Sequence, residues 1–491
     1  MKKRLIVLLF LVALSIPAVW LIIKPGYFPI HDDTQIVRVS QMHQALSEGQ
    51  FPVRFVKDLG YGYGYPIFNF YNPLPYYFGA FFMFLGLNAI AATKIMFIFP
   101  IILCGLTMFL LARKYFSQLA ALATGLFYIY APYHAVQIYV RGAVAEYWAY
   151  AFLPLLILAW LNQQKLLAGV VLGLLILSHN LTALMIIPIL GILFFIKLFL
   201  TKSKSSFIYY SLQVCLIGLG LAGFFWLPAL LEKGFTQVSL MLANQSRTSE
   251  HFIFPYQLWT SGWGFGGSVA GINDGMSFMV GKLHLILSFF SLPIIFMSRK
   301  LNKKVKLLLI FCFSCLILSF FMIFPLSSFI WSNFRILDFI QFPWRWLIFI
   351  TLFTCILTGF SIDYFEKIAK KYVNKKIVII ISSLLIVMFV TYSSKFFKPK
   401  YKFPMTAEQA LAVERVEWLI SMRSDEYLPQ GFIVPETKEE ALGPKNPVNQ
   451  KIIENFIQTN PLRTTANFIS LASILWLILQ LFKKRFKLLV K

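Results

Sequence analysis

The chain has 491 residues, of which 58% are hydrophobic and 13% are charged, and its formal net charge is +25. Soluble globular proteins have about 45–50% apolar and about 25% charged residues, because their surface must be hydrated. The composition therefore excludes an ordinary soluble enzyme, a disordered chain and a disulfide scaffold, and repeated apolar runs of about 20 residues indicate a polytopic membrane protein.

Hydropathy predicts an all-α protein with about twelve membrane-spanning helices and both termini in the cytoplasm. The first span, 5–23, follows Met1-Lys2-Lys3-Arg4 and is too long for a typical signal-peptide core, which indicates an uncleaved helix. A shorter apolar run at 73–87 is predicted to lie at the membrane interface. The other predicted spans are 91–112, 117–131, 146–161, 166–180, 181–200, 207–231, 279–298, 305–324, 344–362, 377–394 and 465–482.

The distribution of charge supports this topology. The segments predicted to lie inside hold 24 of the 45 Lys and Arg residues, but only Asp363 and Glu366 among the acidic residues. Such an excess marks cytoplasmic loops and favours contact with anionic membrane lipids, so it does not imply nucleic-acid binding. We expect a multi-pass membrane protein with a basic cytoplasmic face.

The predicted organisation has three parts. Residues 1–394 form a transmembrane module that includes the outer loop 24–90, residues 395–464 form an external cap, and residues 465–491 form the last span and a basic cytoplasmic tail. The cap is too short and too polar to house an active site alone. The chain has no G-x-x-x-x-G-K-[ST] loop, so no nucleotide cofactor is expected.

Two adjacent carboxylates and a histidine, His31-Asp32-Asp33, stand just beyond the first predicted span. Apolar residues then recur at helical spacing, which predicts an amphipathic helix over 34–48 on the membrane surface, with Asp33 as its N-cap. A cap needs only one acid. Asp32 and Asp33 are therefore candidate catalytic or metal-binding residues, and the alternative is one capping and one solvated carboxylate.

Aromatic residues follow in the same loop. Tyr61, Tyr63 and Tyr65 alternate with glycine, which disfavours a helix and predicts an irregular loop with exposed aromatic faces. Such faces suit the C–H groups of sugar rings, and the alternative is an interfacial aromatic belt. Sugar or acceptor binding is also predicted for His31, Glu146 and His179, although a satisfied buried polar pair is the alternative for His179 and Asn180.

Arginines stand at the predicted outer ends of other spans, where a charge usually faces the protein interior or a wet cavity. Arg141, Arg335 and Arg345 are candidate ligands of a phosphate, because a guanidinium can bind two phosphate oxygens at once. Arg345 lies between two tryptophans and follows Pro343, so we expect it to share a cavity with Asp32 and Asp33. The alternative is an interfacial anchor.

The first span, the paired aspartates in the first outer loop, the amphipathic helix and the dozen spans together resemble the GT-C-type membrane glycosyltransferases. More narrowly, the chain resembles prokaryotic membrane proteins labelled 6-pyruvoyl-tetrahydropterin synthase-related. This second resemblance rests on His31-Asp32-Asp33, Phe70-Tyr71-Asn72-Pro73-Leu74, Gln341-Phe342-Pro343-Trp344-Arg345-Trp346 and Glu426-Tyr427-Leu428-Pro429. Soluble pterin synthases need a three-histidine zinc site, and the six histidines here lack that spacing, so pterin synthesis is not implied.

The GT-C resemblance implies transfer of a hexose or pentose from a polyprenyl phosphate donor to a glycan, lipid or protein acceptor on the outer face. A carboxylate of the first loop, Asp33 or Asp32, would then be the base, and the pair would accept a divalent Mg²⁺ or Mn²⁺. The alternatives are a lipid-linked sugar flippase or exporter and a non-catalytic cell-envelope assembly protein. Polar residues gather at the outer span ends and not at span centres, which favours an enzyme over a transporter.

Overall fold

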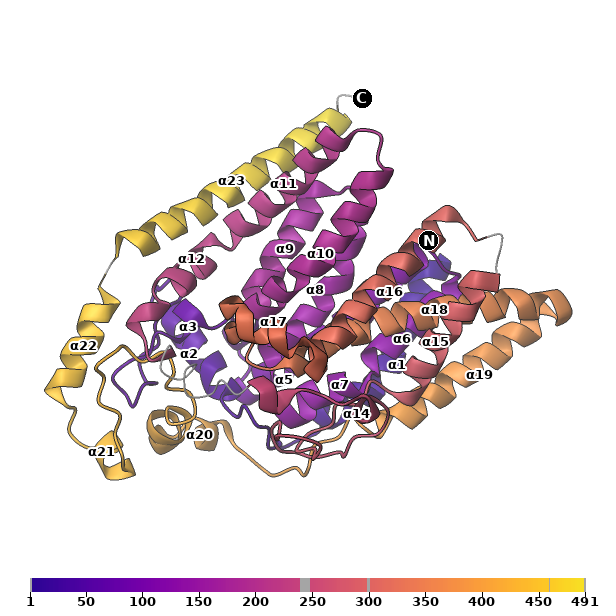
Figure 1. Cartoon of the computed structure of the whole chain (residues 1–491). Helices are drawn as coiled ribbons and strands as arrows, with labels where there is room; N and C mark the ends of the chain where they lie inside the picture. The colour runs from indigo at the N-terminus through magenta and orange to yellow at the C-terminus, as the bar shows by residue number, and fades with distance from the viewer. Residues whose placement is uncertain (1, 239–247, 298–300, 459, 490–491) are drawn as a thin grey trace.

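The computed structural model describes residues 2–238, 248–297, 301–458 and 460–489, and within these ranges the chain is helical, with isolated β-bridges in place of strands (Figure 1). Eight helical segments of the described chain are long and apolar enough to cross a membrane. They contain α1 (Lys2–Ile23), α5 (Ala89–Arg113), α8 (Val144–Leu161), α10 (Asn180–Leu200), α16 (Lys303–Ile323), α18 (Leu347–Tyr372), α19 (Lys375–Ser394) and α23 (Pro461–Leu489).

Two further pairs of helices are bent. α6 (Gln118–Ile129) meets α7 (Pro132–Ala135) and the π-helix η1 (Val136–Arg141) at 42°, and α11 (Lys204–Leu221) meets α12 (Gly223–Leu231) at 77°. If each pair is one span, the described chain has up to ten, so the predicted count of about twelve is not confirmed. The difference includes α9 (Lys165–Ser178) and α15 (Lys282–Met297), which rise about 21–24 Å, short of the ~30 Å hydrocarbon core.

The run predicted to lie at the interface forms α4 (Leu74–Phe84), a helix of 11 residues. At 1.5 Å per residue it rises about 16 Å, roughly half of the hydrocarbon thickness. It packs against α2 (Gln35–Ser47) and α5. Its length agrees with a segment that does not cross the membrane.

The predicted amphipathic helix is α2, but its surroundings differ from the prediction. Packing against α4 and α5 buries most of its residues, including the polar Gln35, Arg38 and Gln41, so α2 lies inside the protein and not on a surface. Its N-cap is Thr34, whose side chain makes no capping hydrogen bond. Asp33 does not cap the helix because its carboxylate is held by arginines of residues 395–464, which we call the outer segment after their predicted location.

The segment after α19 contains short elements only: α20 (Ala407–Ala410), the π-helix η7 (Glu414–Ile420), α21 (Lys438–Leu442) and α22 (Pro447–Ile457). In Figure 1 they lie at the end of the molecule that also holds α2 and α3 (Ile67–Phe70), away from both termini. Paired backbone hydrogen bonds of 2.9 and 3.0 Å join Tyr27 to Phe403. The outer segment therefore packs on the first loop.

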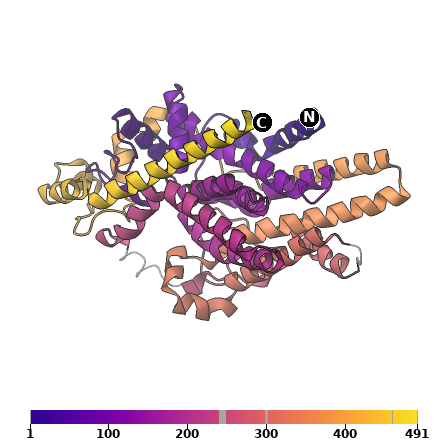
Figure 2. The same ribbon diagram turned by 90° about the horizontal axis from the view of Figure 1, so that it is seen from above.

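Burial separates central from peripheral helices. In the segment that contains α18, 94% of the apolar window is buried inside the protein, compared with 28% for α1 and α19 and 22% for α10. α18 is therefore the most buried of the candidate spans in the described chain, and the apolar faces of the other three remain available to lipid. Figure 2 shows α18 and α19 as a hairpin that extends to one side of the molecule.

The charge distribution gives a topological prediction. A reporter fused after Lys114, or within 299–306, should lie in the cytoplasm, and one inserted within 405–450 should lie outside, because the basic segments should remain inside. Reporter activity in whole cells measures this. An external signal after Lys114 would mean that α4 crosses the membrane, and the topology would have to be inverted from that point.

Candidate functional site

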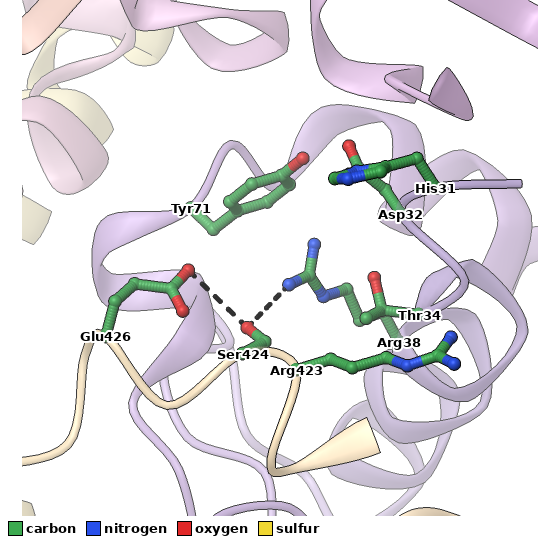
Figure 3. A pocket seen from close by; sticks show the side chains of 8 residues that line it. All are labelled: His31, Asp32, Thr34, Arg38, Tyr71, Arg423, Ser424 and Glu426. Carbon is green, nitrogen blue, oxygen red and sulfur yellow. Dashed lines mark hydrogen bonds and ion pairs between the residues drawn. The ribbon is translucent and has the colours of Figure 1, made fainter. Parts of the chain in front are cut away.

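A cavity of about 390 Å³ lies where the first loop meets the outer segment (Figure 3). One wall comes from the residues before and within α2 and from the turn after α3, and the other comes from the turn after η7. Both walls are rich in charged and hydrogen-bonding side chains. The lining residues are His31, Asp32, Thr34, Arg38, Tyr71, Arg423, Ser424 and Glu426.

Backbone contacts with η1 position the histidine and the first aspartate. The amide of His31 donates to the carbonyl of Val140 at 2.9 Å, and the amide of Asp32 donates to that of Arg141 at 2.8 Å. Gly142 directly follows η1 and has a φ of +67°. A Cβ there would lie 2.5 Å from the Cδ1 of Ile30, so glycine is needed both for the left-handed turn and for the close approach.

Asp32 faces the cavity in an electropositive environment. Its Oδ1 lies 3.0 Å from the Nδ1 of His31, and 38% of its side chain is exposed. Burial raises the pKa of Asp32, but the hydrogen bond with His31 and the charges of Arg141 and Arg38 outweigh burial and hold this pKa below its usual value. The same hydrogen bond raises the pKa of His31. Asp32 is therefore a carboxylate at neutral pH, with a basic partner beside it.

Asp33 points to a different partner and does not line the cavity. Its Oδ2 lies 2.6 Å from the Nη2 of Arg415 and 3.5 Å from the Nη1 of Arg423, and only 18% of its side chain is exposed. Burial raises the pKa of Asp33 more than the two arginines lower it. The two adjacent acids therefore have different environments: Asp32 faces the cavity, and Asp33 holds the outer segment.

Arg38 is the central cation of the cavity. Its Nη2 donates to the Oγ of Ser424 at 2.7 Å, and its guanidinium lies 4.4 Å from the centre of the Tyr71 ring. Figure 3 shows this guanidinium between Tyr71 and Ser424. Its Nε is buried and has no hydrogen-bond partner in the described part of the chain. Contacts from two distant segments thus fix the Arg38 side chain and leave one donor unused.

The outer segment supplies the opposite wall of the cavity. The Oε1 of Glu426 lies 3.5 Å from the Oγ of Ser424, and burial raises the pKa of Glu426 despite the charge of Arg38. Arg423 is the most accessible of the arginines at this site, with 49% of its side chain exposed. The cavity therefore combines the carboxyl groups of Asp32 and Glu426 with one fixed and one accessible guanidinium.

A second polar cluster lies behind Asp32. The Nη1 of Arg141 donates to the Oε2 of Glu146 at 2.8 Å, and its guanidinium lies 4.5 Å from the ring centre of Trp344. The Nη1 of Arg345 donates to the carbonyl of Ile340 at 2.9 Å. Arg345 interacts electrostatically with Glu146 and Asp32 but does not line the cavity. The structure therefore does not place Arg345 in a cavity with Asp32 and Asp33, contrary to the expectation from the sequence.

Other predicted site residues lie elsewhere. Arg335 is exposed at the start of η5 (Arg335–Ile340) and does not line the cavity. His179 is buried, and its Nδ1 lies 2.7 Å from the Oγ1 of Thr182 at the start of α10, which agrees with the alternative of a satisfied buried polar residue. Neither residue belongs to the cavity.

The predicted exposure of the loop tyrosines is wrong for two of the three. Tyr61 and Tyr65 are almost fully buried, and Tyr63 is half-buried. Aromatic side chains of the outer segment cover them: Tyr61 packs against Trp418 and Phe432, Tyr63 against Phe432, and Tyr65 against Tyr427. The alternating glycines do make an irregular loop, but its rings bind the outer segment.

The two aspartates do not form a metal-binding pair. Asp32 is paired with His31 and Asp33 with Arg415, and in the described ranges no group of three or more His, Cys, Asp and Glu side chains is placed to hold a metal ion. A divalent ion usually needs several such oxygen ligands from the protein or its substrate. These residues therefore do not fit the predicted Mg²⁺ or Mn²⁺ site, and no catalytic step is assigned to a metal.

Sequence reasoning missed Arg38, Tyr71, Arg423 and Ser424 as site residues. One signal was present: Thr34, Arg38 and Gln41 follow each other at helical spacing, so α2 has a polar stripe that predicts a buried polar contact. Tyr71 and Glu426 lie in motifs that carry the family resemblance. Nothing local indicated that these motifs meet in space.

The Asp33–Arg415 ion pair gives a prediction about stability. Arg415→Met should lower the free energy of unfolding by about 2 kcal/mol, because it leaves a largely buried carboxylate with only the longer, 3.5 Å contact to Arg423. Lys438→Met is the matched control, since the Lys438–Glu414 pair is exposed and should contribute about 0–1 kcal/mol. Thermal unfolding in detergent and protease cleavage within 395–464 measure this. Equal effects of the two substitutions would contradict the docking role of Asp33.

Comparison with known proteins identifies the family. A family model described as the 6-pyruvoyl-tetrahydropterin synthase related domain, a membrane protein, matches residues 68–396, about two thirds of the chain. A search of curated proteins gives no match. The matched range includes Tyr71 but neither 31–38 nor 423–426, so most of the cavity lies outside it. The chain belongs to the membrane protein family described as 6-pyruvoyl-tetrahydropterin synthase-related.

Proposed function

We propose that this protein is a membrane glycosyltransferase that moves a sugar from a polyprenyl phosphate donor to an acceptor hydroxyl at the outer face of a prokaryotic plasma membrane. The observation that carries the proposal is the ionised, accessible carboxylate of Asp32 in one cavity with the guanidinium groups of Arg38 and Arg423. Transfer from a sugar phosphate needs both: a base for the acceptor and cations for the leaving phosphate.

Asp32 is the proposed general base. As the acceptor oxygen attacks the anomeric carbon, Asp32 takes the hydroxyl proton, and a new glycosidic bond forms. The bond between the anomeric carbon and the phosphate oxygen breaks, and its electron pair remains on polyprenyl phosphate. Because the pKa of Asp32 lies below its usual value, its carboxyl group is deprotonated at neutral pH and has a free site for the proton of the acceptor hydroxyl. Asp33 is a weaker candidate, because its carboxylate is already engaged by Arg415.

Arg38 and Arg423 are the proposed phosphate ligands, in place of the sequence candidates Arg335 and Arg345. Phosphate gains negative charge as it leaves, and donors fixed in advance stabilise that charge without reorganisation. Arg38 is fixed by Ser424 and Tyr71, whereas Arg423 can reach an incoming group because half of its side chain is exposed. His31 stays beside Asp32 and would hydrogen-bond the sugar or the acceptor.

The position of the cavity suits a lipid-linked donor. It lies at one end of the apolar helices, and the helix α4 packs on α2 beside it. A polyprenyl chain can remain in the bilayer while its phosphate reaches the headgroup level. A flippase would instead be expected to carry ionisable residues near the bilayer midplane. Flipping of the intact donor, or an assembly role without transfer, remains the alternative outcome of the tests below.

The first test separates the two aspartates. Asp32→Asn should lower the transfer rate by about 100-fold or more, because it removes the base but keeps the shape. Asp33→Asn should retain most activity and mainly affect stability. The assay uses vesicles with purified protein and radiolabelled polyprenyl-phosphate hexose or pentose, and measures release of polyprenyl phosphate. Full activity of Asp32→Asn would remove the catalytic assignment, and movement of intact donor between leaflets would indicate a flippase.

The second test concerns the phosphate ligands. Arg423→Gln should reduce transfer by about 10- to 100-fold, because a cation at the leaving phosphate is lost. Arg335→Gln removes the same charge from an exposed arginine outside the cavity and should leave the rate unchanged. Both variants are measured in the same vesicles, with insertion checked by reporter topology. If Arg335→Gln is the more damaging of the two, the assignment of this cavity is wrong.

A further inference from the structure

A second cavity, of about 220 Å³, is built differently from the first. Three lysines line it: Lys114 just after α5, Lys197 in the last turn of α10, and Lys304 in the first turn of α16. Apolar side chains complete the wall, among them Leu161, Leu193, Leu308 and Phe311. These elements meet at the ends of the helices that the charge distribution places in the cytoplasm.

The lysines converge without an opposite charge. In the described ranges no carboxylate forms an ion pair with any of the three, and the Nζ of Lys114 donates to a neutral partner, the Oδ1 of Asn162, at 2.5 Å. Burial, together with the charges of Lys197 and Lys304, lowers the pKa of Lys114 to about 8. Like charges that share a cavity repel each other, and a bound anion would remove that cost.

We infer that this cavity binds the phosphate group of an anionic membrane lipid. Lysine ammonium groups act as point charges that suit a phosphodiester of variable orientation. The leucine-rich wall suits the first part of an acyl chain, which a free phosphate ion lacks. Basic pockets between membrane helices on the cytoplasmic side bind lipid headgroups in this way. The inference is independent of the proposed glycosyl transfer, because it concerns a different cavity.

The test compares two triple substitutions that remove the same charge. One variant carries Lys114→Gln, Lys197→Gln and Lys304→Gln. The control carries Lys202→Gln, Lys204→Gln and Lys306→Gln, three exposed lysines of the same end that do not line the cavity. The midpoint of thermal unfolding in detergent is followed as phosphatidylglycerol, phosphatidylcholine or inorganic phosphate is added, since a ligand of the folded state raises it.

Phosphatidylglycerol should raise the unfolding midpoint of the natural protein and of the control more than phosphatidylcholine does. The cavity variant should lose most of this shift and need at least tenfold more lipid for half of the effect. Equal loss in both variants would indicate general surface charge and overturn the proposal. If inorganic phosphate raised the midpoint by the same amount, the ligand would be a free anion, and the lipid proposal would be wrong. If the cavity variant does not fold, a photoactivatable phosphatidylglycerol should label the natural protein at 114, 197 and 304, and labelling elsewhere overturns the site.

Discussion

The burial of Arg38 is the interaction on which the candidate site depends. A guanidinium removed from water costs several kcal/mol unless charges, hydrogen bonds or an aromatic face compensate it. Arg38 obtains the ring of Tyr71 from the first loop and the hydroxyl of Ser424 from the outer segment. Separation of the two segments would remove the Ser424 hydroxyl from this cation and leave it with the Tyr71 ring alone of these two partners. The energetic cost of that state keeps the two walls of the cavity together, although the segments that form them are almost 400 residues apart in the sequence.

A second buried ionic network fastens the other side of the outer segment. The Nη2 of Arg463, at the start of α23, lies 2.9 Å from the Oε2 of Glu232, which also accepts from Asn69 at 2.8 Å. Asn69 in turn accepts from Arg54 at 2.9 Å, and burial lowers the pKa of Arg54 to about 10. The first loop, the end of α12 and the last span are thus joined by charges that water does not reach. The outer segment is held at both ends, which suits a cavity whose walls must keep a fixed distance.

The long helices could be predicted from the sequence, because a span of about 20 apolar residues is a local signal. α5, α16 and α19 begin and end within a few residues of their predicted bounds. The total number of spans could not be predicted, because it depends on helix breaks within apolar runs, and a hydropathy average over about 20 residues does not detect them. Pro132 starts a new helix after α6, and Ala222 lies at the 77° bend between α11 and α12. Hydropathy also does not give the length of a helix. α9 and α15 are apolar, but each is shorter than the hydrocarbon core is thick.

The candidate site could be predicted only in part, for a related reason. His31 and Asp32 carry a local signal, because a helix cap needs only one of the two adjacent acids and the histidine adds a third titratable group. Arg423, Ser424 and Glu426 look like an ordinary polar turn until the outer segment is placed on the first loop. The same docking buries Tyr61 and Tyr65, although the alternation of glycine and tyrosine predicts exposed rings. Long-range pairing decided each of these environments, and such pairing leaves no periodicity in the chain.

The contrast between Asp32 and Asp33 shows how far that dependence goes. The two residues are neighbours with the same chemistry, and a sequence offers no reason to assign them different roles. The backbone of Arg141 holds the amide of Asp32 at 2.8 Å, while the side chain of Arg415 holds the carboxylate of Asp33 at 2.6 Å. One aspartate is thereby turned into the cavity and kept ionised, and the other is used for docking. Because the second aspartate holds the segment that carries Ser424, an acid outside the cavity helps to keep a hydrogen-bond partner of Arg38 in place.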